Sequence, residues 1–315
     1  MNGRELDLEA ILGGSDDVVP EGHRSGIVCL AGRPNVGKST LLNAMVGQKV
    51  SIVTSVPGTT RNAIRGVVTR EDAQIVFIDT PGVTKPQTLL ARRLNELVRH
   101  TWTGVDVICF VVDAAGGIGT GDEYLAKQLS DVATPLVCVV NKEDVKRGPR
   151  LAPELLKARE LGDFAEIVPT SATDGFNVEH LVDVLVGYLP EGPRLFPGGQ
   201  VSDQADEQLV AEIIREKFVT RVFDEVPHSI AVQIDGFGIN EERDDLLDVS
   251  AVIHVERDSQ KGIVIGKGGS VIKAANTEAR QELEVIFGMK VYLDVRVKVS
   301  KNWQRDPKKL GQFGY

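Results

Sequence analysis

The sequence has 315 residues, of which 42% are hydrophobic, 26% charged and only 5% aromatic. This composition excludes wholesale disorder, and the length favours two domains over a single core. The net charge of −9 argues against a generic nucleic-acid-binding protein, and no run of about 18 apolar residues predicts a membrane-spanning helix.

The first segment, residues 1–24, is acidic and lacks both the basic start and the apolar centre of a signal peptide. We expect an N-terminal extension there and assign it no role. Cys29, Cys109 and Cys138 each lie within an apolar run, and no two of them have metal-site spacing. They are predicted to be buried thiols in a reducing compartment.

Residues 25–190 alternate short apolar runs with helix-length amphipathic stretches. This alternation predicts an α/β fold, a mostly parallel sheet with helices on both faces. Polar, glycine-containing loops follow the runs, where ligands bind in such sheets. The runs are residues 27–30, 75–78, 107–112, 136–140 and 167–168.

A glycine-rich loop follows the first run. Residues 32–39 read GRPNVGKS and fit the P-loop pattern, in which backbone N–H groups surround phosphate oxygens at the start of a helix. Lys38 is predicted to reach the β- and γ-phosphate oxygens, and Ser39 to bind Mg²⁺. The predicted nucleotide contacts here are Gly32, Arg33, Pro34, Asn35, Val36, Gly37, Lys38, Ser39 and Thr40.

Two further segments are predicted to act on the metal ion and the γ-phosphate. Asp79 begins the sequence DTPG at the end of the second run, which supplies a carboxylate for the metal shell and a free N–H at Gly82. The loop PGTTR at residues 57–61 offers threonine hydroxyls, and we favour Thr60 over Thr59. The expected catalytic residues are Lys38, Thr60, Asp79 and Gly82, the Mg²⁺ ligands Ser39, Thr60 and Asp79, and the nucleotide contacts Asp79, Thr80, Pro81, Gly82 and Val83.

The base is predicted to be guanine. The sequence NKED at residues 141–144 ends another strand, and the carboxylate of Asp144 can accept from both N1–H and the 2-amino group of guanine. Adenine offers neither donor, so a buried Asp144 would be left unpaired. The predicted base contacts are Asn141, Lys142, Glu143, Asp144, Ser171 and Ala172. The ligands expected from these motifs are therefore GTP or GDP with Mg²⁺.

A second domain is predicted after a Pro- and Gly-containing linker at residues 191–208. Residues 209–315 read in the order α–β–β–α–α–β, with GKGG at residues 266–269 between two helices. Residues 261–315 carry 11 basic and 5 acidic side chains, which favours an anionic polymer as partner. Such a glycine loop allows close approach of RNA backbone. The predicted RNA contacts are Gly266, Lys267, Gly268, Gly269 and Lys273.

These motifs resemble those of the translation-factor-related GTPases and, within them, the bacterial Era family. The resemblance covers residues 25–315 and includes VIGKGG and the later Trp303, Asp306 and Gly314-Tyr315. It implies a P-loop GTPase domain followed by an α+β type II KH domain, whose element order matches the order read above. It also implies assembly of the small (30S) ribosomal subunit as the role, with the KH domain bound near the 3′ end of 16S rRNA during rRNA maturation.

The resemblance further implies a cytoplasmic protein that associates peripherally with the inner face of the cell membrane, and we expect a monomer. Asn35 resembles the residue that binds K⁺ in a subset of such GTPases. Val83 stands where signalling GTPases place a water-orienting glutamine, so we expect slow intrinsic hydrolysis that RNA accelerates. Arg61 and Arg65 are predicted to be solvated loop residues rather than arginine fingers.

Two alternatives remain open from the sequence. The chain could be a P-loop NTPase whose C-terminal domain binds protein, or a nucleotide-gated RNA scaffold in which hydrolysis is incidental. The helix after Val83, which carries leucines from Leu89 to Leu97, is expected to pack one face on the sheet. We further expect GTP to alter the docking of residues 209–315 and thereby their access to RNA.

Overall fold

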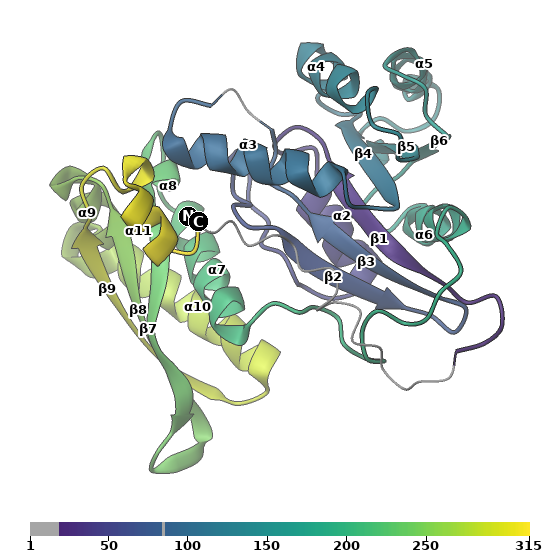
Figure 1. Ribbon diagram of the computed structural model, residues 1–315. Coiled ribbons are helices and arrows are strands. Elements are labelled where there is room, and N and C mark those ends of the chain that lie inside the picture. The colour runs from purple at the N-terminus through teal and green to yellow at the C-terminus, as the bar shows by residue number, and fades with distance from the viewer. Residues whose placement is uncertain (1–18, 84–85) are drawn as a thin grey trace. The chain divides into compact units, whose positions relative to one another are not determined.

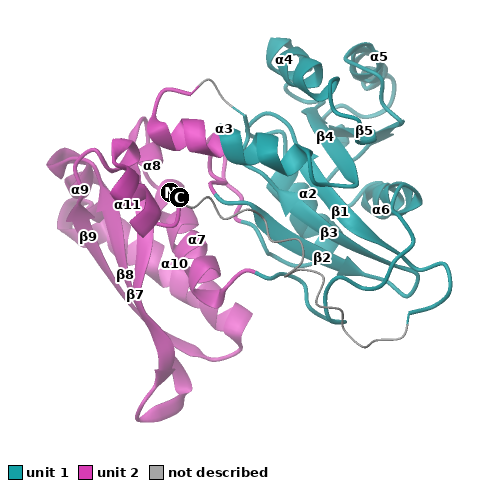
Figure 2. Ribbon diagram, viewed as in Figure 1, with its two compact units in different colours: residues 1–51, 62–84, 95–203 teal, residues 52–61, 85–94, 204–315 magenta. Residues whose placement is uncertain are grey.

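The computed structural model describes residues 19–83 and 86–315, which divide into two compact units. Unit 1 comprises residues 1–51, 62–84 and 95–203, and unit 2 comprises residues 52–61, 85–94 and 204–315 (Figure 2). Most of the acidic extension, residues 1–18, therefore lies outside the described residues. Within the described residues, no helix is both long and apolar enough to cross a membrane.

A six-stranded sheet forms the centre of unit 1 (Figure 1), with strand order β2-β3-β1-β4-β5-β6. All neighbouring pairs are parallel except β2 and β3. The five predicted runs all lie in strands, whereas β2 is not predicted because polar residues interrupt this short edge strand. The strands are β1 (Arg24–Ala31), β2 (Ile64–Thr69), β3 (Ala73–Asp79), β4 (Val107–Asp113), β5 (Leu136–Asn141) and β6 (Glu166–Pro169).

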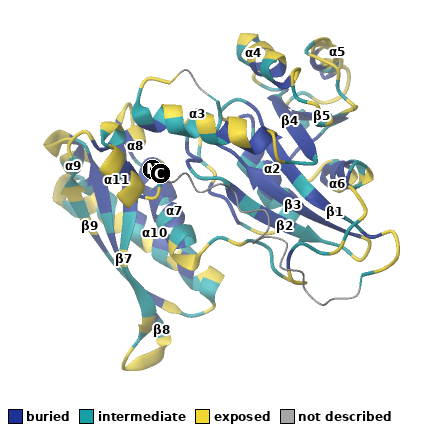
Figure 3. Ribbon diagram, in the orientation of Figure 1, coloured by how far each residue is buried: buried dark blue, intermediate teal, exposed yellow. Residues whose placement is uncertain are grey.

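Helices cover both faces of this sheet, as the alternating sequence predicts (Figure 3). On one face, α2 (Lys38–Val46) and α6 (Val178–Gly187) pack on a core of strand residues such as Leu30 and Val111. On the other face, α3 (Leu89–Trp102), α4 (Thr120–Leu129) and α5 (Ala152–Glu160) form the second core. The three cysteines are buried and free, and burial raises the pKa of each thiol.

Helix α3 departs from its prediction. Its second half packs on the sheet core through Val98 and Trp102. Its first half belongs to unit 2, where Leu89, Leu90 and Leu94 pack with Trp303 instead. The expectation that one face of the whole helix packs on the sheet is therefore wrong for its first turns, because amphipathic periodicity shows which face is apolar but not what covers it.

The segment predicted as a linker also differs in part from the structure. Residues 191–203 belong to unit 1, where the main-chain N–H groups of Leu195 and Phe196 donate to the buried side chain of Gln74. The N–H of Val67 donates to the carbonyl oxygen of Val201 at 2.8 Å. Pro and Gly content indicates correctly that regular structure stops here, but such content does not show whether a segment is packed.

Unit 2 contains a three-stranded sheet with order β7-β8-β9, in which β8 pairs antiparallel with β7 and parallel with β9. Val291 and Val295 on β9 are buried while Tyr292 and Arg296 are exposed, so the predicted alternation is confirmed. The elements are α7 (Asp206–Val219), α8 (Val226–Ser229), β7 (Ala231–Asn240), β8 (Arg243–Val255), α9 (Asp258–Ile265), α10 (Ser270–Phe287), β9 (Lys290–Val299) and α11 (Pro307–Gln312).

Candidate nucleotide site and RNA-binding loop

The P-loop connects β1 to α2 at the carboxyl end of the sheet, as its motif requires. Gly32 and Gly37 adopt φ values of 153° and 99°, which side chains rarely adopt, and Asn35 also has a positive φ of 63°. The buried ammonium of Lys38 donates to the carbonyl oxygens of Gly32 at 3.1 Å and Arg33 at 3.0 Å. Burial lowers the pKa of Lys38, which an anionic phosphate would counteract.

Ser39 and Asp79 form a pair suited to a hard divalent cation. The Ser39 hydroxyl donates to Asp79 Oδ2 at 2.5 Å, and the Ser51 hydroxyl donates to the same oxygen at 3.1 Å. The other oxygen, Oδ1, is buried and has no hydrogen-bond partner among the described residues. Burial raises the pKa of Asp79 despite the nearby Lys38. A hydroxyl and an unsatisfied carboxylate oxygen fit Mg²⁺, whose preferred ligands are oxygens.

Gly82 lies directly against the P-loop, because a Cβ atom there would meet the main-chain nitrogen of Pro34 at 2.5 Å. Only glycine allows this approach, which brings the N–H-bearing backbone of DTPG beside the phosphate loop. Thr80 is fixed by donating its hydroxyl to the carbonyl oxygen of Leu30 at 2.8 Å. Val83 packs against the core of the α3 face of the sheet, which agrees with its inability to orient water.

Thr60 is not part of the unit that contains the P-loop. Residues 52–61 belong to unit 2, and Thr60 is 8% exposed there. Its role as a metal ligand therefore stays a prediction. The expectation of a solvated side chain is wrong for Arg61, which is 4% exposed, whereas Arg65 is partly exposed and pairs with Asp203. A basic residue in a polar loop reads as solvated until its tertiary partners are known.

Asn141 joins the P-loop to the loop after β6. Its amide donates to the carbonyl oxygen of Val36 at 2.9 Å, and its Oδ1 accepts from the N–H of Ala172 at 3.1 Å. Lys142, with φ 66°, donates through Nζ to the carbonyl oxygen of Asn35 at 2.7 Å. These bonds explain why an asparagine and a lysine stand here: they fasten the base-binding loop to the phosphate-binding loop.

Asp144 is half-buried rather than buried, and its Oδ1 accepts from the Ser171 hydroxyl at 2.7 Å. This bond orients the carboxylate that is predicted to read guanine. Glu143 contributes its N–H to the carbonyl oxygen of Thr170 at 3.0 Å, so the NKED loop and the loop after β6 are held together by main-chain and side-chain bonds. The predicted base contacts thus converge at one end of β5 and β6.

Four supporting residues lie outside any recognisable motif and are not predicted from the sequence. Asp122 accepts from Arg33 Nε at 2.7 Å, and Asp113 pairs with Lys142 at 2.7 Å. Asn43 Oδ1 accepts from the N–H of Ser51 at 2.9 Å, which presents the Ser51 hydroxyl to Asp79. Of these four, only Asp113 could have been suspected from the sequence, because it stands at the carboxyl end of a buried strand, where ligands bind in such sheets.

The GKGG loop joins α9 to α10 in unit 2. Gly266, Gly268 and Gly269 have φ values of 76°, 60° and 79°, so the loop uses glycine for its backbone shape. A Cβ at Gly268 would meet no atom within 4 Å, which leaves its outer side open to a ligand. Lys267 and Lys273 are exposed beside it. An open, glycine-shaped backbone flanked by cations is suited to a sugar–phosphate chain.

Comparison with known proteins identifies a family for each of the two domains. Residues 27–142 match the 50S ribosome-binding GTPase family, and residues 225–304 match the KH domain family. The GTPase Era of Mycolicibacterium smegmatis is 53% identical over 93% of this chain and 99% of its own length. The GTPase Era of Mycobacterium tuberculosis is 52% identical over 92% of this chain and 98% of its own length.

Two solved structures show the same likeness in three dimensions. The Aquifex aeolicus Era variant Y63A bound to GDP·AlF₄⁻ superposes with a TM-score of 0.90 at 38% identity and covers 93% of this chain and 99% of its own. An Era bound to MgGDPNP and nucleotides 1506–1542 of 16S ribosomal RNA gives 0.88 at 40% identity with the same coverage. The α/β and α+β fold classes predicted from the sequence are confirmed. The chain belongs to the Era family of GTPases, with a P-loop GTPase domain followed by a KH domain.

Proposed function

We propose that this GTPase is a nucleotide-controlled switch whose KH domain binds the 3′ region of 16S rRNA and which assists assembly of the small ribosomal subunit and maturation of its rRNA. The observation that carries the RNA part is the open GKGG loop with Lys267 and Lys273 exposed beside it. The relative solved with 16S rRNA nucleotides 1506–1542 supports this choice of RNA. The proposed location is the cytoplasm, with the chain a monomer.

Hydrolysis needs charge neutralisation and a positioned water rather than covalent chemistry by the protein. Lys38 and the P-loop N–H groups supply positive charge to the phosphates. Ser39 and Asp79 would hold Mg²⁺, which when bound neutralises developing charge on the β- and γ-phosphate oxygens. Because valine has no hydrogen-bonding group, and Val83 packs against the core, no side chain at this position orients the attacking water. Intrinsic turnover should therefore be slow, with RNA or the ribosome increasing it.

A potassium ion at Asn35 is also part of the proposal. Asn35 is exposed on the phosphate loop, and its left-handed backbone is fastened through its carbonyl oxygen to Lys142. A monovalent cation there would add positive charge where an arginine finger acts in other GTPases. Hydrolysis should be faster in K⁺ than in Na⁺ buffer, and Asn35→Ala should remove the difference. Equal rates of the unchanged protein in both buffers would discard this part.

Crosslinking of the bound RNA in cells tests the proposed substrate. Crosslinks should concentrate at the 3′ end of 16S rRNA and disappear when Lys267 and Gly268 are both replaced by Asp. Cells depleted of the protein should accumulate small-subunit precursors with unprocessed 16S rRNA. Crosslinks spread over unrelated RNAs, or normal rRNA processing after depletion, would contradict the proposal.

Two measurements separate this proposal from its alternatives. Single-stranded RNA binding in a filter assay distinguishes it from a P-loop NTPase whose C-terminal domain binds protein. Single-turnover GTP hydrolysis with and without RNA distinguishes it from a scaffold with incidental hydrolysis. In the hydrolysis assay, Lys38→Ala should abolish nucleotide binding or hydrolysis, because its ammonium lies at the P-loop carbonyls of Gly32 and Arg33, where the phosphates are expected to bind.

A further inference from the structure

Two segments that continue directly from the nucleotide site belong to the RNA-binding unit (Figure 2). The first, residues 52–61, follows Ser51, whose hydroxyl donates to Asp79. It contains Thr59 and Thr60, the candidate γ-phosphate-responsive threonines. The second, residues 86–94, follows the DTPG sequence and includes the start of α3. Any rearrangement that GTP imposes on these segments must therefore change contacts inside unit 2.

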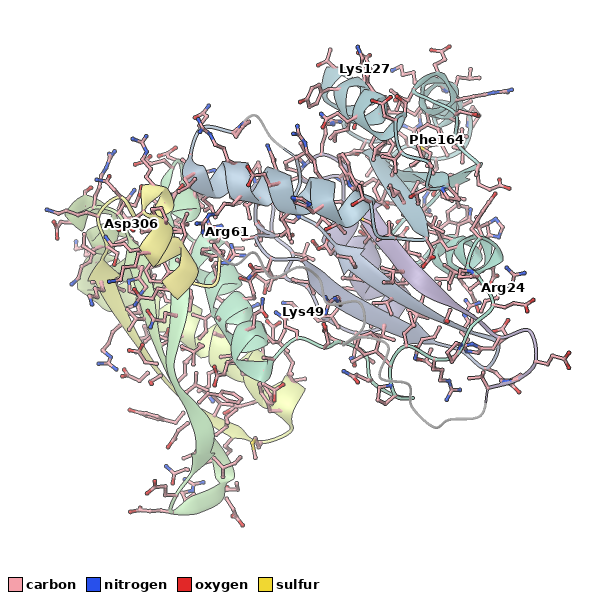
Figure 4. The ribbon with its side chains drawn as sticks, viewed as in Figure 1. Arg24, Lys49, Arg61, Lys127, Phe164 and Asp306 are labelled. Carbon is pink, nitrogen blue, oxygen red and sulfur yellow. The ribbon has the colours of Figure 1, made fainter. Side chains whose placement is uncertain are left out.

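Arg61 fastens the end of the first segment in the interior of unit 2, where Figure 4 labels it. Its guanidinium donates to the carbonyl oxygens of Ile230 at 2.6 Å and His228 at 2.9 Å. It also lies 5.7 Å from the ring centroid of Trp303 and 5.6 Å from that of Tyr315. A planar guanidinium can satisfy carbonyls at its edge and aromatic rings at its faces, which an ammonium cannot do.

The same segment is held from helix α7 as well. Arg215, which is 1% exposed and paired with Glu212, donates to the carbonyl oxygen of Thr59. Glu216 accepts from the N–H of Val53 at 3.0 Å. Because Arg215 and Glu216 bind main-chain atoms, these contacts fix the backbone of the segment rather than one side chain. The segment is therefore held at Val53 and Thr59 by α7, and at its last residue by the guanidinium of Arg61.

Tyr315 contacts both segments. Its hydroxyl lies 3.4 Å from Arg61 Nη1, and its main-chain oxygen accepts from Arg93 Nη1 at 2.9 Å. Its ring stacks on buried Trp303 with centroids 5.7 Å apart, and Trp303 packs with Leu90 at the start of α3. The Trp303 ring nitrogen donates to the carbonyl oxygen of Ser229 at 2.8 Å, which ties this cluster to the α8–β7 turn that Arg61 also binds.

We propose that Tyr315 and Arg61 are positioning residues that couple the nucleotide state to RNA binding, by holding residues 52–61 and 86–94 on the cluster formed by Trp303, Leu310, Phe313 and Tyr315. This rests on the proposed function. GTP-driven movement of either segment alters contacts with Tyr315, so the same cluster responds to movement of both segments. By linkage, RNA binding that favours one arrangement of the cluster must favour one nucleotide state to the same extent.

The test is the ratio of RNA dissociation constants measured with GDP and with GDPNP, using an RNA of the sequence of 16S rRNA nucleotides 1506–1542. Coupling of ordinary size corresponds to about a 5- to 150-fold ratio. Tyr315→Ala and Arg61→Lys should bring the ratio close to 1 and remove the RNA stimulation of hydrolysis. Tyr315→Phe, which keeps the ring, should restore most of both.

Tyr292→Ala is the matched control, because Tyr292 is a tyrosine of the same unit that is 62% exposed on β9. It should keep the ratio of the unchanged protein. If Tyr315→Ala is unstable, Tyr315→Leu is measured in its place. Leucine retains apolar volume against Trp303 but removes the hydroxyl and the aromatic face, so it should also bring the ratio close to 1. A ratio of 1 in the unchanged protein, or an unaltered ratio in Tyr315→Ala (or Tyr315→Leu in its place) and in Arg61→Lys, overturns the proposal.

Failure of this proposal can be distinguished from failure of the proposed function. GDP affinity reports on the P-loop, and RNA affinity in the GDP state reports on the GKGG loop. Both should be retained in Tyr315→Ala and Arg61→Lys, so loss of the coupling without loss of either affinity identifies the cluster. If RNA binding or GTP hydrolysis were missing from the unchanged protein, the proposed function itself would fail.

Discussion

Asp144 shows how a single side chain is prepared for recognition. Its carboxylate is oriented by the Ser171 hydroxyl, which also accepts from the N–H of Asp174 at 3.1 Å. A fixed acceptor discriminates between bases because it cannot turn away from a ligand that offers no donor. Its half-buried position leaves the carboxylate accessible to a base while the Ser171 bond limits its rotation.

Asp144→Asn should transfer preference from GTP to xanthosine triphosphate. The amide presents a donor to the 2-position, where guanine has an amino group and xanthine an oxygen. GTP affinity should fall by roughly 100-fold or more, since the new amide donor would face the 2-amino donor of guanine and leave both unmatched. Competition of each triphosphate against a fluorescent GDP measures this. Asp174→Asn, which removes an exposed ion pair with Arg147 nearby, is the control and should keep GTP preference.

His254 gives a pH-dependent stability to unit 2. Burial, assisted by Lys298 and Lys309 and opposed by Asp235, lowers its pKa from 6.5 to about 4. Its Nδ1 lies 2.9 Å from the Ser300 hydroxyl and its Nε2 lies 3.2 Å from Gln233, while Phe313 packs on the ring. The neutral imidazole is therefore the form that the folded state prefers.

Because the folded pKa is depressed, the unfolded state takes up a proton first as pH falls. The contribution of His254 is fully present above pH 6.5 and is lost towards pH 4, at about 1.4 kcal/mol per pH unit and about 3 kcal/mol in total. Urea unfolding of the unchanged protein and of His254→Gln at pH 7, 6 and 5 tests this. The variant should gain stability relative to the unchanged protein as pH falls. If the free energies of unfolding of the two proteins changed in parallel with pH, this role of His254 would be ruled out.

At the scale of elements, the turn from α9 to α10 leaves its backbone accessible to a ligand and does not pack against other residues at Gly268. Its three glycines have positive φ, yet a Cβ at Gly268 meets nothing. Glycine is therefore needed there for backbone shape and for access, not for lack of internal space. Gly266 is the C-cap of α9 and Gly269 is the N-cap of α10, so substitutions at the two positions between them spare both helix caps.

Replacing Lys267 and Gly268 together by Asp should weaken RNA binding by at least about 100-fold while leaving GTP affinity unchanged, because like charge then faces the RNA backbone. The matched control replaces Gly288 and Lys290 by Asp. Gly288 has φ 65°, a Cβ there would meet no atom within 4 Å, and Lys290 is exposed, so the control makes the same charge change at a similar backbone angle. Equal loss of RNA binding in both variants would show a non-specific charge effect.

At the scale of the whole molecule, each of the two units has a hydrophobic core that is not shared with the other. The core of α2, α6 and the parallel sheet includes Leu181, and the core of unit 2 includes Leu283, both 0% exposed. We therefore expect each unit to unfold as a cooperative body. The nucleotide should therefore stabilise unit 1 selectively, by about 2.7 kcal/mol at a ligand concentration of 100 times Kd.

Leu283→Ala should destabilise unit 2 by about 2–5 kcal/mol and lower RNA affinity, and Leu181→Ala should do the same to unit 1 and to GDP affinity. Scanning calorimetry with and without Mg·GDP assigns each transition, since only the transition of unit 1 should move with ligand. If both variants shifted both transitions equally, the two units would not be separate cooperative bodies.

The sequence alone determined the mostly parallel sheet except for β2, the order of the principal elements in the second unit, and the expected chemistry of the P-loop, DTPG, NKED and GKGG segments. It could do so because these features are local: side-chain periodicity, backbone freedom of glycine and the order of motifs along strands. The position of Asp144 just after the end of β5, for example, follows from NKED coming directly after an apolar run.

Only the tertiary structure decided where Arg61, Leu90 and Tyr315 lie. An arginine in a loop, a leucine on an amphipathic helix and a tyrosine at the end of the sequence carry no local sign of a shared environment. Their contacts join residues separated by 254 positions, as between Arg61 and Tyr315. Burial of the Arg61 charge depends on carbonyl oxygens and aromatic rings from distant segments. The sequence pattern of one segment therefore does not predict that burial.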